Sequence, residues 1–149
     1  MKTEKKIQTR IELEKWMKDN CYNFKSYSIN GNSIPEGYGI EINHGLYNWY
    51  YTERGEKRTL EYFATEKDIV EFAFEKIKND PYADSNLIGT IKDSTEIEKM
   101  KFELKKRNID FWTNEMNFSS WSDKRTNFFV KGCDIKKVTD LIKTGYNNV

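Results

Sequence analysis

The stretch Leu46–Phe63, LYNWYYTERGEKRTLEYF, decides the fold of this chain. Its first half, Leu46–Thr52, alternates with a period of two, which is typical of a β-strand that places successive side chains on opposite faces. One face then carries Tyr47, Trp49 and Tyr51, and the other carries Leu46, Asn48 and Tyr50. The segment Glu53–Lys57 predicts a hairpin turn in which Gly55 supplies a positive φ. The return strand follows as Arg58–Phe63.

Helices and strands are expected on both sides of this hairpin. Upstream, the pattern predicts a helix over Thr3–Asn20, a strand in Phe24–Asn30 and a half-buried strand in Tyr38–Ile42. Downstream, Thr65 is expected to cap a helix whose apolar face runs from Ile69 to Ile77 and which Asp80-Pro81 ends.

A second run of elements follows residue 84. Thr95 and Glu98 match a capping box that would open an amphipathic helix ending near Arg107-Asn108. The other expected elements are the strands Leu87–Lys92, Ile109–Met116 and Thr126–Lys131 and a closing helix over Asp134–Thr144.

The element order predicts an α+β fold in which helices pack on one face of antiparallel sheet. The order is α-β-β-β-β-α and then β-α-β-β-α, so the second unit has the order of a ferredoxin-like half. We expect one domain over residues 1–149, with sub-lobes 1–84 and 85–149 as the alternative, because no Gly/Ser-rich or Pro-rich linker separates them.

Composition limits the classes of partner. The 149 residues contain 25 Lys and Arg against 24 Asp and Glu, which gives a net charge of +1. Nucleic-acid-binding domains usually carry a basic excess, because their affinity comes from neutralising phosphates. Aromatic residues make up 15% of the chain, and they supply apolar area that the low aliphatic content lacks. We therefore expect a folded domain with a charged surface, and the charge balance argues against nucleic acid.

Cysteine and histidine content bears on compartment and cofactors. The two cysteines, Cys21 and Cys133, lie far apart in sequence; we favour two free thiols in a reducing cytoplasm over a disulfide. With His44 as the only histidine, a metal site of the usual nitrogen and sulfur ligands cannot be assembled, and no cofactor is expected. No stretch approaches the ~20 apolar residues that cross a bilayer. We expect a cytoplasmic protein without a membrane contact.

Catalytic motifs are not found in the sequence. It contains no Gly-rich phosphate loop and no nucleophile elbow, and Ser119, Ser120 and Cys133 have no neighbouring base. Glu41, Glu53 and Glu61 could approach one another across neighbouring strands, but a chain with 24 carboxylates produces such pairs by chance. We predict that the protein is not an enzyme.

The aromatic face of Leu46–Thr52 has two interpretations. Its rings form the core if helices cover both faces of the sheet, and they form a contact surface if one face is open, because such rings are enriched at protein interfaces. An open face could also stack unpaired bases. The adjoining turn mixes Arg54 and Lys57 with Glu53 and Glu56, which favours a protein partner over a polyanion. Trp121, in a polar loop, is either a core anchor or a second contact.

The sequence Tyr47-x-Trp49-x-Tyr51-Thr52-Glu53-Arg54-Gly55, followed by Leu60-x-Tyr62-Phe63 and the helix at Thr65, resembles small bacterial immunity proteins. These proteins are encoded beside polymorphic or contact-dependent toxins and neutralise them by binding. The resemblance covers about a third of the chain and rests on the Glu-Arg-Gly turn after an aromatic strand; beyond residue 84 it rests on element order alone.

The resemblance implies a non-enzymatic inhibitor of a cognate toxin protein, often a nuclease. Acidic residues would then meet a basic cleft on the toxin, with aromatic residues as hot spots. The residues implied or considered for partner binding are Tyr47, Trp49, Tyr51, Glu53, Arg54, Glu61 and Trp121. The alternative function is a single-stranded nucleic-acid-binding module that uses the aromatic sheet face, and a homodimer is compatible with either.

Overall fold

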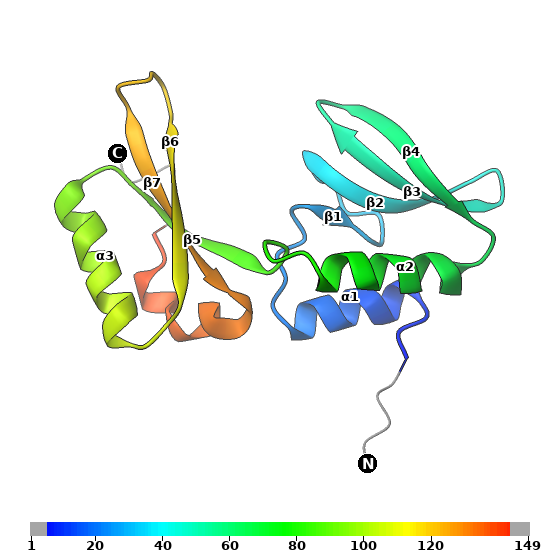
Figure 1. Cartoon of the computed structure of the whole chain (residues 1–149), viewed down its shortest axis with the longest axis horizontal. Coiled ribbons are helices and arrows are strands. Elements are labelled where there is room, and N and C mark those ends of the chain that lie inside the picture. Colours follow the sequence, from blue (N-terminus) through cyan, green and yellow to red (C-terminus); the bar gives the residue numbers. More distant parts are fainter. Residues whose placement is uncertain (1–5, 144–149) are drawn as a thin grey trace, which may run out of the picture. The chain divides into compact units, whose positions relative to one another are not determined.

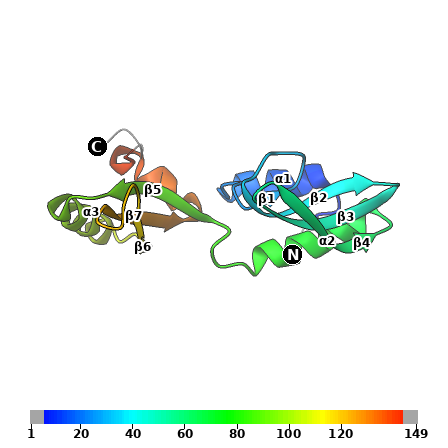
Figure 2. The ribbon, with the colours of Figure 1, turned by 90° about the horizontal axis from the view of Figure 1, so that it is seen from above.

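The computed structural model describes residues 6–143 and divides the chain into two compact units, Met1–Ala83 and Asp84–Val149. We refer to them as unit 1 and unit 2, and each is described by itself (Figures 1 and 2). The sub-lobe boundary expected from the sequence lies one residue further along the chain. Both units combine helices with antiparallel sheet, which confirms the predicted α+β class.

Unit 1 is a four-stranded sheet with two helices on one face (Figure 1). The sheet has the order β1-β2-β3-β4; β2, β3 and β4 are antiparallel, and the short β1 pairs with β2 in parallel. The elements are α1 (Arg10–Asp19), β1 (Tyr27–Ser28), β2 (Glu36–Asn43), β3 (Leu46–Glu53), β4 (Glu56–Phe63) and α2 (Glu66–Lys78).

Both hairpins of unit 1 close through two-residue turns with positive φ. Arg54 (φ 50°) and Gly55 (φ 81°) join β3 to β4, and His44 (φ 53°) and Gly45 (φ 76°) join β2 to β3. Positive φ at both central residues is the turn geometry that matches the twist of paired strands. The predicted turn at Gly55 is thereby confirmed.

The helices of unit 1 begin at threonine caps. The Thr65 hydroxyl accepts a hydrogen bond from the backbone N–H of Asp68, as predicted. The helix expected over Thr3–Asn20 begins later, at Arg10, because Thr9 and Glu12 form a reciprocal capping box that fixes its start. Residues 3–5 of that expected helix lie outside the described part of the chain.

The core of unit 1 lies between the sheet and the two helices. Leu13 and Met17 of α1 and Ile69 and Ile77 of α2 are at most 1% exposed. Trp49 of β3 joins this cluster with 3% exposure. The face of β3 that carries Trp49 is therefore the face that the helices cover.

Unit 2 is a three-stranded sheet packed against one α-helix. β7 lies between β5 and β6 and is antiparallel to both, so β5 and β6 are parallel to each other. This split β-α-β arrangement is the expected ferredoxin-like half. Its elements are β5 (Ser85–Ile91), α3 (Ser94–Lys106), β6 (Phe111–Asn117), β7 (Lys124–Lys131) and the 3₁₀ helices η1 (Gly132–Lys137) and η2 (Thr139–Leu141).

Two local predictions in unit 2 were wrong. Asp93, and not Thr95, caps α3, because its carboxylate accepts from the backbone N–H groups of Thr95 and Glu96. The closing segment forms two short 3₁₀ helices in place of an α-helix; of its apolar residues only Val138 is fully buried. The chain then runs on to Lys143, whose N–H donates to the carbonyl of Ile88 in β5. Thr144 lies outside the described residues.

The free-thiol expectation was also wrong. Cys21 and Cys133 are both disulfide-bonded. Disulfides are typical of oxidising compartments, so the cysteines no longer support a reducing one. Separately, none of the helices in residues 6–143 has the length and apolar character that crossing a bilayer requires.

Candidate partner-binding site

A row of aromatic rings lies on the helix-facing side of the sheet in unit 1. The rings of Tyr38 and Trp49 stack with centroids 5.7 Å apart and planes 10° from parallel. The ring centroid of Tyr27 lies 6.3 Å from that of Trp49, and the ring centroid of Tyr51 lies 5.1 Å from that of Tyr38. Three adjacent strands therefore contribute to one aromatic layer, of which the sequence predicted only the part on β3.

A cavity of about 460 Å³ lies over this layer, between the sheet and α2. Tyr27, Tyr38 and Trp49 line it from the sheet, and Phe72 lines it from α2 with its ring edge-on to Trp49 at 5.6 Å. We call this space the aromatic cavity. Its volume is within the usual range for ligand pockets. Trp49 is thus a core residue that reaches the surface only as a wall of the cavity.

A β-bulge in the edge strand β4 shapes the mouth of the aromatic cavity. Trp49 pairs with Glu61 and Tyr50 pairs with Thr59, so Leu60 is an extra residue in β4. A bulge re-aims the side chains beside it. Here both Leu60 and Glu61 line the cavity, and both remain exposed. The structure therefore brings together two of the predicted site residues, Trp49 and Glu61.

The cavity lining includes a buried tyrosine, Tyr27, and an aspartate, Asp80. The Tyr27 hydroxyl donates a 2.6 Å hydrogen bond to the Asp80 carboxylate, whose other oxygen accepts from the N–H of Tyr82. Burial and the Asp80 hydrogen bond raise the pKa of Tyr27 far above its ordinary value of 10.0. Tyr27 therefore stays protonated at neutral pH and holds Asp80 in place as a donor.

Three glutamates form an acidic strip at the end of the sheet where β2 begins and the turn joins β3 to β4. Glu36 is paired across the sheet with Glu53, and Glu53 is paired with Glu56. The Tyr51 hydroxyl lies 2.9 Å from the carboxylate of Glu36 and 3.1 Å from that of Glu53, and it shares its one proton between these two acceptors. The pKa of Tyr51 is raised to about 12, chiefly by the hydrogen bond to Glu36 and then by desolvation and the hydrogen bond to Glu53. No described cation pairs with any of the three carboxylates of the strip.

The remaining predicted residues of unit 1 lie at other positions. Arg54 is exposed at the tip of the β3–β4 turn. Tyr47 is partly buried at the margin of the core, with the guanidinium of Arg10 5.9 Å from its ring centroid. Glu41 forms an ion pair with Lys57 (2.9 Å) and pairs across the sheet with Asn48, so it does not make the approach to Glu53 and Glu61 that the sequence left open.

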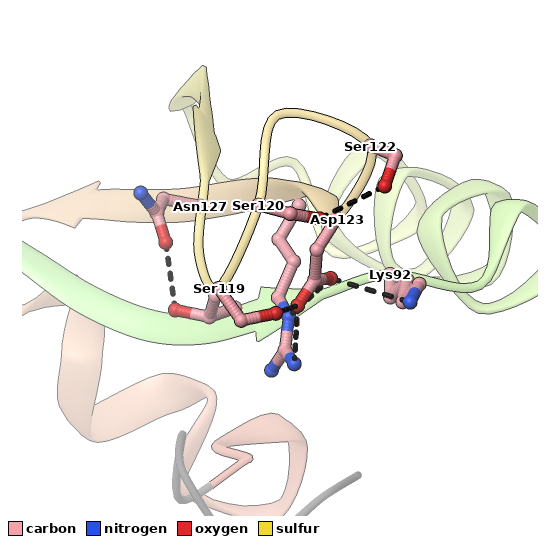
Figure 3. A network of polar contacts seen from close by, with 8 residues as sticks. Lys92, Ser119, Ser120, Ser122, Asp123 and Asn127 are labelled. Atoms are coloured by element: carbon pink, nitrogen blue, oxygen red, sulfur yellow. Dashed lines mark hydrogen bonds and ion pairs between the residues drawn. The ribbon is translucent and has the colours of Figure 1, made fainter.

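Trp121 lies in unit 2, in the loop that joins β6 to β7. Its side chain is 88% exposed, which excludes the core-anchor interpretation. The loop around it is ordered by Asp123, which accepts from the Ser119 hydroxyl at 2.8 Å and from the Arg125 guanidinium at 3.2 and 3.3 Å (Figure 3). The Nζ of Lys92, the residue directly after β5, lies 3.3 Å from the same carboxylate. A fixed polar loop therefore presents a bare indole ring.

The Asp123 contacts predict a pH dependence of stability. The Arg125 guanidinium, followed by the Ser119 hydroxyl, holds the pKa of Asp123 well below its ordinary range. A depressed carboxyl pKa contributes stability above the unfolded-state value of about 3.9, and this contribution is lost as the pH falls through the folded-state value. We expect Asp123→Asn to melt below the wild type at pH 7 and the gap to shrink between pH 4 and pH 2.

Thermal unfolding followed by the amide signals of β6 and β7 would measure this gap. Asp110→Asn is the control, because it removes an exposed carboxylate of unit 2 that forms no ion pair with a described residue. A gap that stays the same at pH 2 and pH 7 would show that the charge of Asp123 does not stabilise the loop.

Within residues 6–143 no three His, Cys, Asp or Glu side chains are grouped so that they could hold a metal ion.

Sequence reasoning missed Tyr27, Phe72 and Asp80 as cavity residues. Phe72 lies on the predicted helix and Asp80 at its expected end, but nothing in the sequence shows that these positions face Trp49.

Searches against protein-family models, curated proteins and solved structures found no match to this chain.

Proposed function

We propose that this chain is an immunity protein, which binds a cognate toxin domain and neutralises it without catalysis. The acidic strip of Glu36, Glu53 and Glu56, which Tyr51 links to the cavity residue Tyr38, is the observation that carries the proposal. The resemblance of Tyr47–Gly55 to immunity proteins supports it independently.

The acidic strip has a cost that a partner would offset. Like charges directly opposite each other on neighbouring strands are destabilising by roughly 0.2–1 kcal/mol per pair. The strip contains two such pairs, Glu36–Glu53 and Glu53–Glu56, and no described Lys or Arg forms an ion pair with them. A basic protein surface docked there would remove the repulsion and would be steered to this end of the sheet. The cleft of a nuclease toxin has that charge.

We place the protein in the cytoplasm of a bacterial cell, where an immunity protein would meet a toxin that has entered. The disulfide-bonded cysteines do not add support for that compartment. A fractionation of the native host with an antibody to this chain would locate it.

Co-purification would test the proposed function. The tagged chain is co-expressed with its gene neighbours, and the bound chains are identified by mass spectrometry. We expect a stoichiometric toxin domain. Glu53→Gln combined with Glu56→Gln should weaken its affinity by about tenfold or more, mainly through slower association that is less sensitive to salt.

A matched control uses Glu71→Gln with Glu75→Gln, which removes the same charge from exposed positions on α2. It should bind the toxin domain with wild-type affinity. Recovery of nucleic acid without any protein partner would refute the immunity function. Equal binding by both double variants would refute the role of the acidic strip and leave the function intact.

The alternative, single-stranded nucleic-acid binding, depends on an open aromatic sheet face. Trp49 is 3% exposed and contacts Phe72 of α2, so this ring is not available as a stacking platform. The carboxylates of the acidic strip, which form no ion pair with a described residue, would also repel phosphates. The observations on unit 1 therefore favour a protein partner.

A further inference from the structure

Glu61 is a carboxylate without a partner at the mouth of the aromatic cavity. Its side chain lines the cavity and stays exposed, and it forms no hydrogen bond or ion pair with any residue between 6 and 143. The bulge at Leu60 sets this position, since it pairs Glu61 directly with Trp49. An exposed carboxylate beside aromatic rings provides a hydrogen-bond acceptor and a negative charge at one point.

The walls of the cavity also attract cations. The face of an aromatic ring carries the negative end of its quadrupole, so an ammonium or guanidinium within about 6 Å of the ring centroid is stabilised. The cavity already shows this contact, because the Nζ of Lys76 lies 5.4 Å from the centroid of Phe72. The nearly parallel Tyr38 and Trp49 rings, by contrast, hold no cation among the described residues.

The charges around the cavity favour a cation over an anion. Two carboxylates, Glu61 and Asp80, and one ammonium, Lys76, line it, which sums to a net charge of −1. A planar group that can both stack on a ring and pair with a carboxylate through two N–H donors uses these features best, and the arginine side chain is that group.

We propose that the aromatic cavity receives the guanidinium of an arginine side chain from the partner protein. The guanidinium stacks on the ring of Tyr38, which is 37% exposed, and donates to the Glu61 carboxylate. This inference rests on the proposed function for the source of the arginine, but the cavity can be tested without any partner.

The test is an NMR titration of the full chain with Nα-acetyl-L-arginine methylamide. The indole N–H signal of Trp49, one of four tryptophans, reports on the cavity. We expect a saturable shift of this signal and no comparable shift of the Trp121 indole. The neutral citrulline analogue, which keeps the shape and loses the charge, should bind about fivefold more weakly or worse.

Two variants have opposite expected effects. Glu61→Gln should weaken binding of the arginine probe by about twofold to fivefold, because it removes the acceptor charge. Lys76→Gln should strengthen binding by about twofold, because it removes the resident cation. Glu98→Gln on α3 of unit 2 is the matched control and should leave the affinity unchanged. All three side chains are solvent-exposed, so the variants should fold like the wild type. The dispersion of their amide signals, compared with that of the wild type, checks this.

The outcomes separate the inference from the proposed function. Absence of a saturable Trp49 shift, equal binding of the citrulline analogue, or weaker binding by Lys76→Gln would overturn the arginine site. A second titration uses uridine 5′-monophosphate. If it shifts the Trp49 signal, and if Glu61→Gln strengthens and Lys76→Gln weakens its binding, the cavity binds a nucleotide and the arginine site is overturned. If Glu61→Gln does not change the affinity of the toxin complex, the arginine site is overturned and the immunity function is retained. If the arginine probe binds as expected but no toxin partner is found, the immunity function is overturned and the arginine site is retained.

Discussion

Trp49→Ala is expected to lower the free energy of unfolding of unit 1 by about 3–5 kcal/mol. The ring is 3% exposed, stacks on Tyr38 and meets Phe72 of α2 edge-on, so its removal leaves a void between the sheet and the helix. Hydrogen exchange of the amides around Leu13, Ile69 and Ile77 would measure the loss, because these core positions report on unit 1.

Trp121→Ala is the matched control for this experiment. It removes the same side chain from an 88% exposed position, so the free energy of unfolding should change by no more than about 0.5 kcal/mol. An equal loss in both variants would contradict the core role of Trp49. A truncation of Trp49 also cannot be used to map a binding surface, because unfolding of unit 1 would abolish binding by itself. Exposed carboxylates such as Glu53 and Glu61 are suitable for that purpose.

Gly37→Ala is expected to destabilise unit 1 by about 3 kcal/mol or more. Gly37 has a φ of 143°, and a Cβ there would overlap the carbonyl oxygen of Ser26 in the backbone. That carbonyl accepts the N–H of Tyr38, so the clash would force β1 away from β2. Because β1 carries Tyr27, the aromatic cavity would lose one wall along with the stability.

Gly31→Ala separates the two causes. Gly31 also has a positive φ, 83°, but a Cβ there would meet nothing within 4 Å. This variant should cost only the backbone strain of about 1–2 kcal/mol. Chemical denaturation of both variants, followed by the Trp49 signal, would compare them. A loss for Gly37→Ala no larger than that for Gly31→Ala would show that β1 adapts without steric conflict.

Much of this fold can be predicted from local patterns. The aromatic alternation of Leu46–Thr52, the Arg54-Gly55 turn and the Thr65 cap each depend on neighbours within a few residues. The structure has all three where the sequence indicates them. Such features are visible in one sequence because backbone conformation and capping are local properties.

The features that the sequence does not reveal are set by residues far apart in the chain. The bulge at Leu60 exists only in the register of β4 against β3. The closing segment after Gly132 has helical periodicity, yet it forms 3₁₀ turns and then bonds to the carbonyl of Ile88 through Lys143. In both places tertiary pairing overrides the local preference, and the cavity residues Tyr27 and Asp80 were missed for the same reason.

The bulge in β4 has a further consequence for the solution behaviour of unit 1. β4 is the edge of its sheet, and a regular edge offers a row of unpaired N–H and C=O groups on which another chain can add a strand. The extra residue at Leu60 interrupts that row, and the exposed Glu56, Lys57 and Arg58 place charges along it. Strand addition, self-association into dimers and aggregation are therefore all disfavoured along this edge.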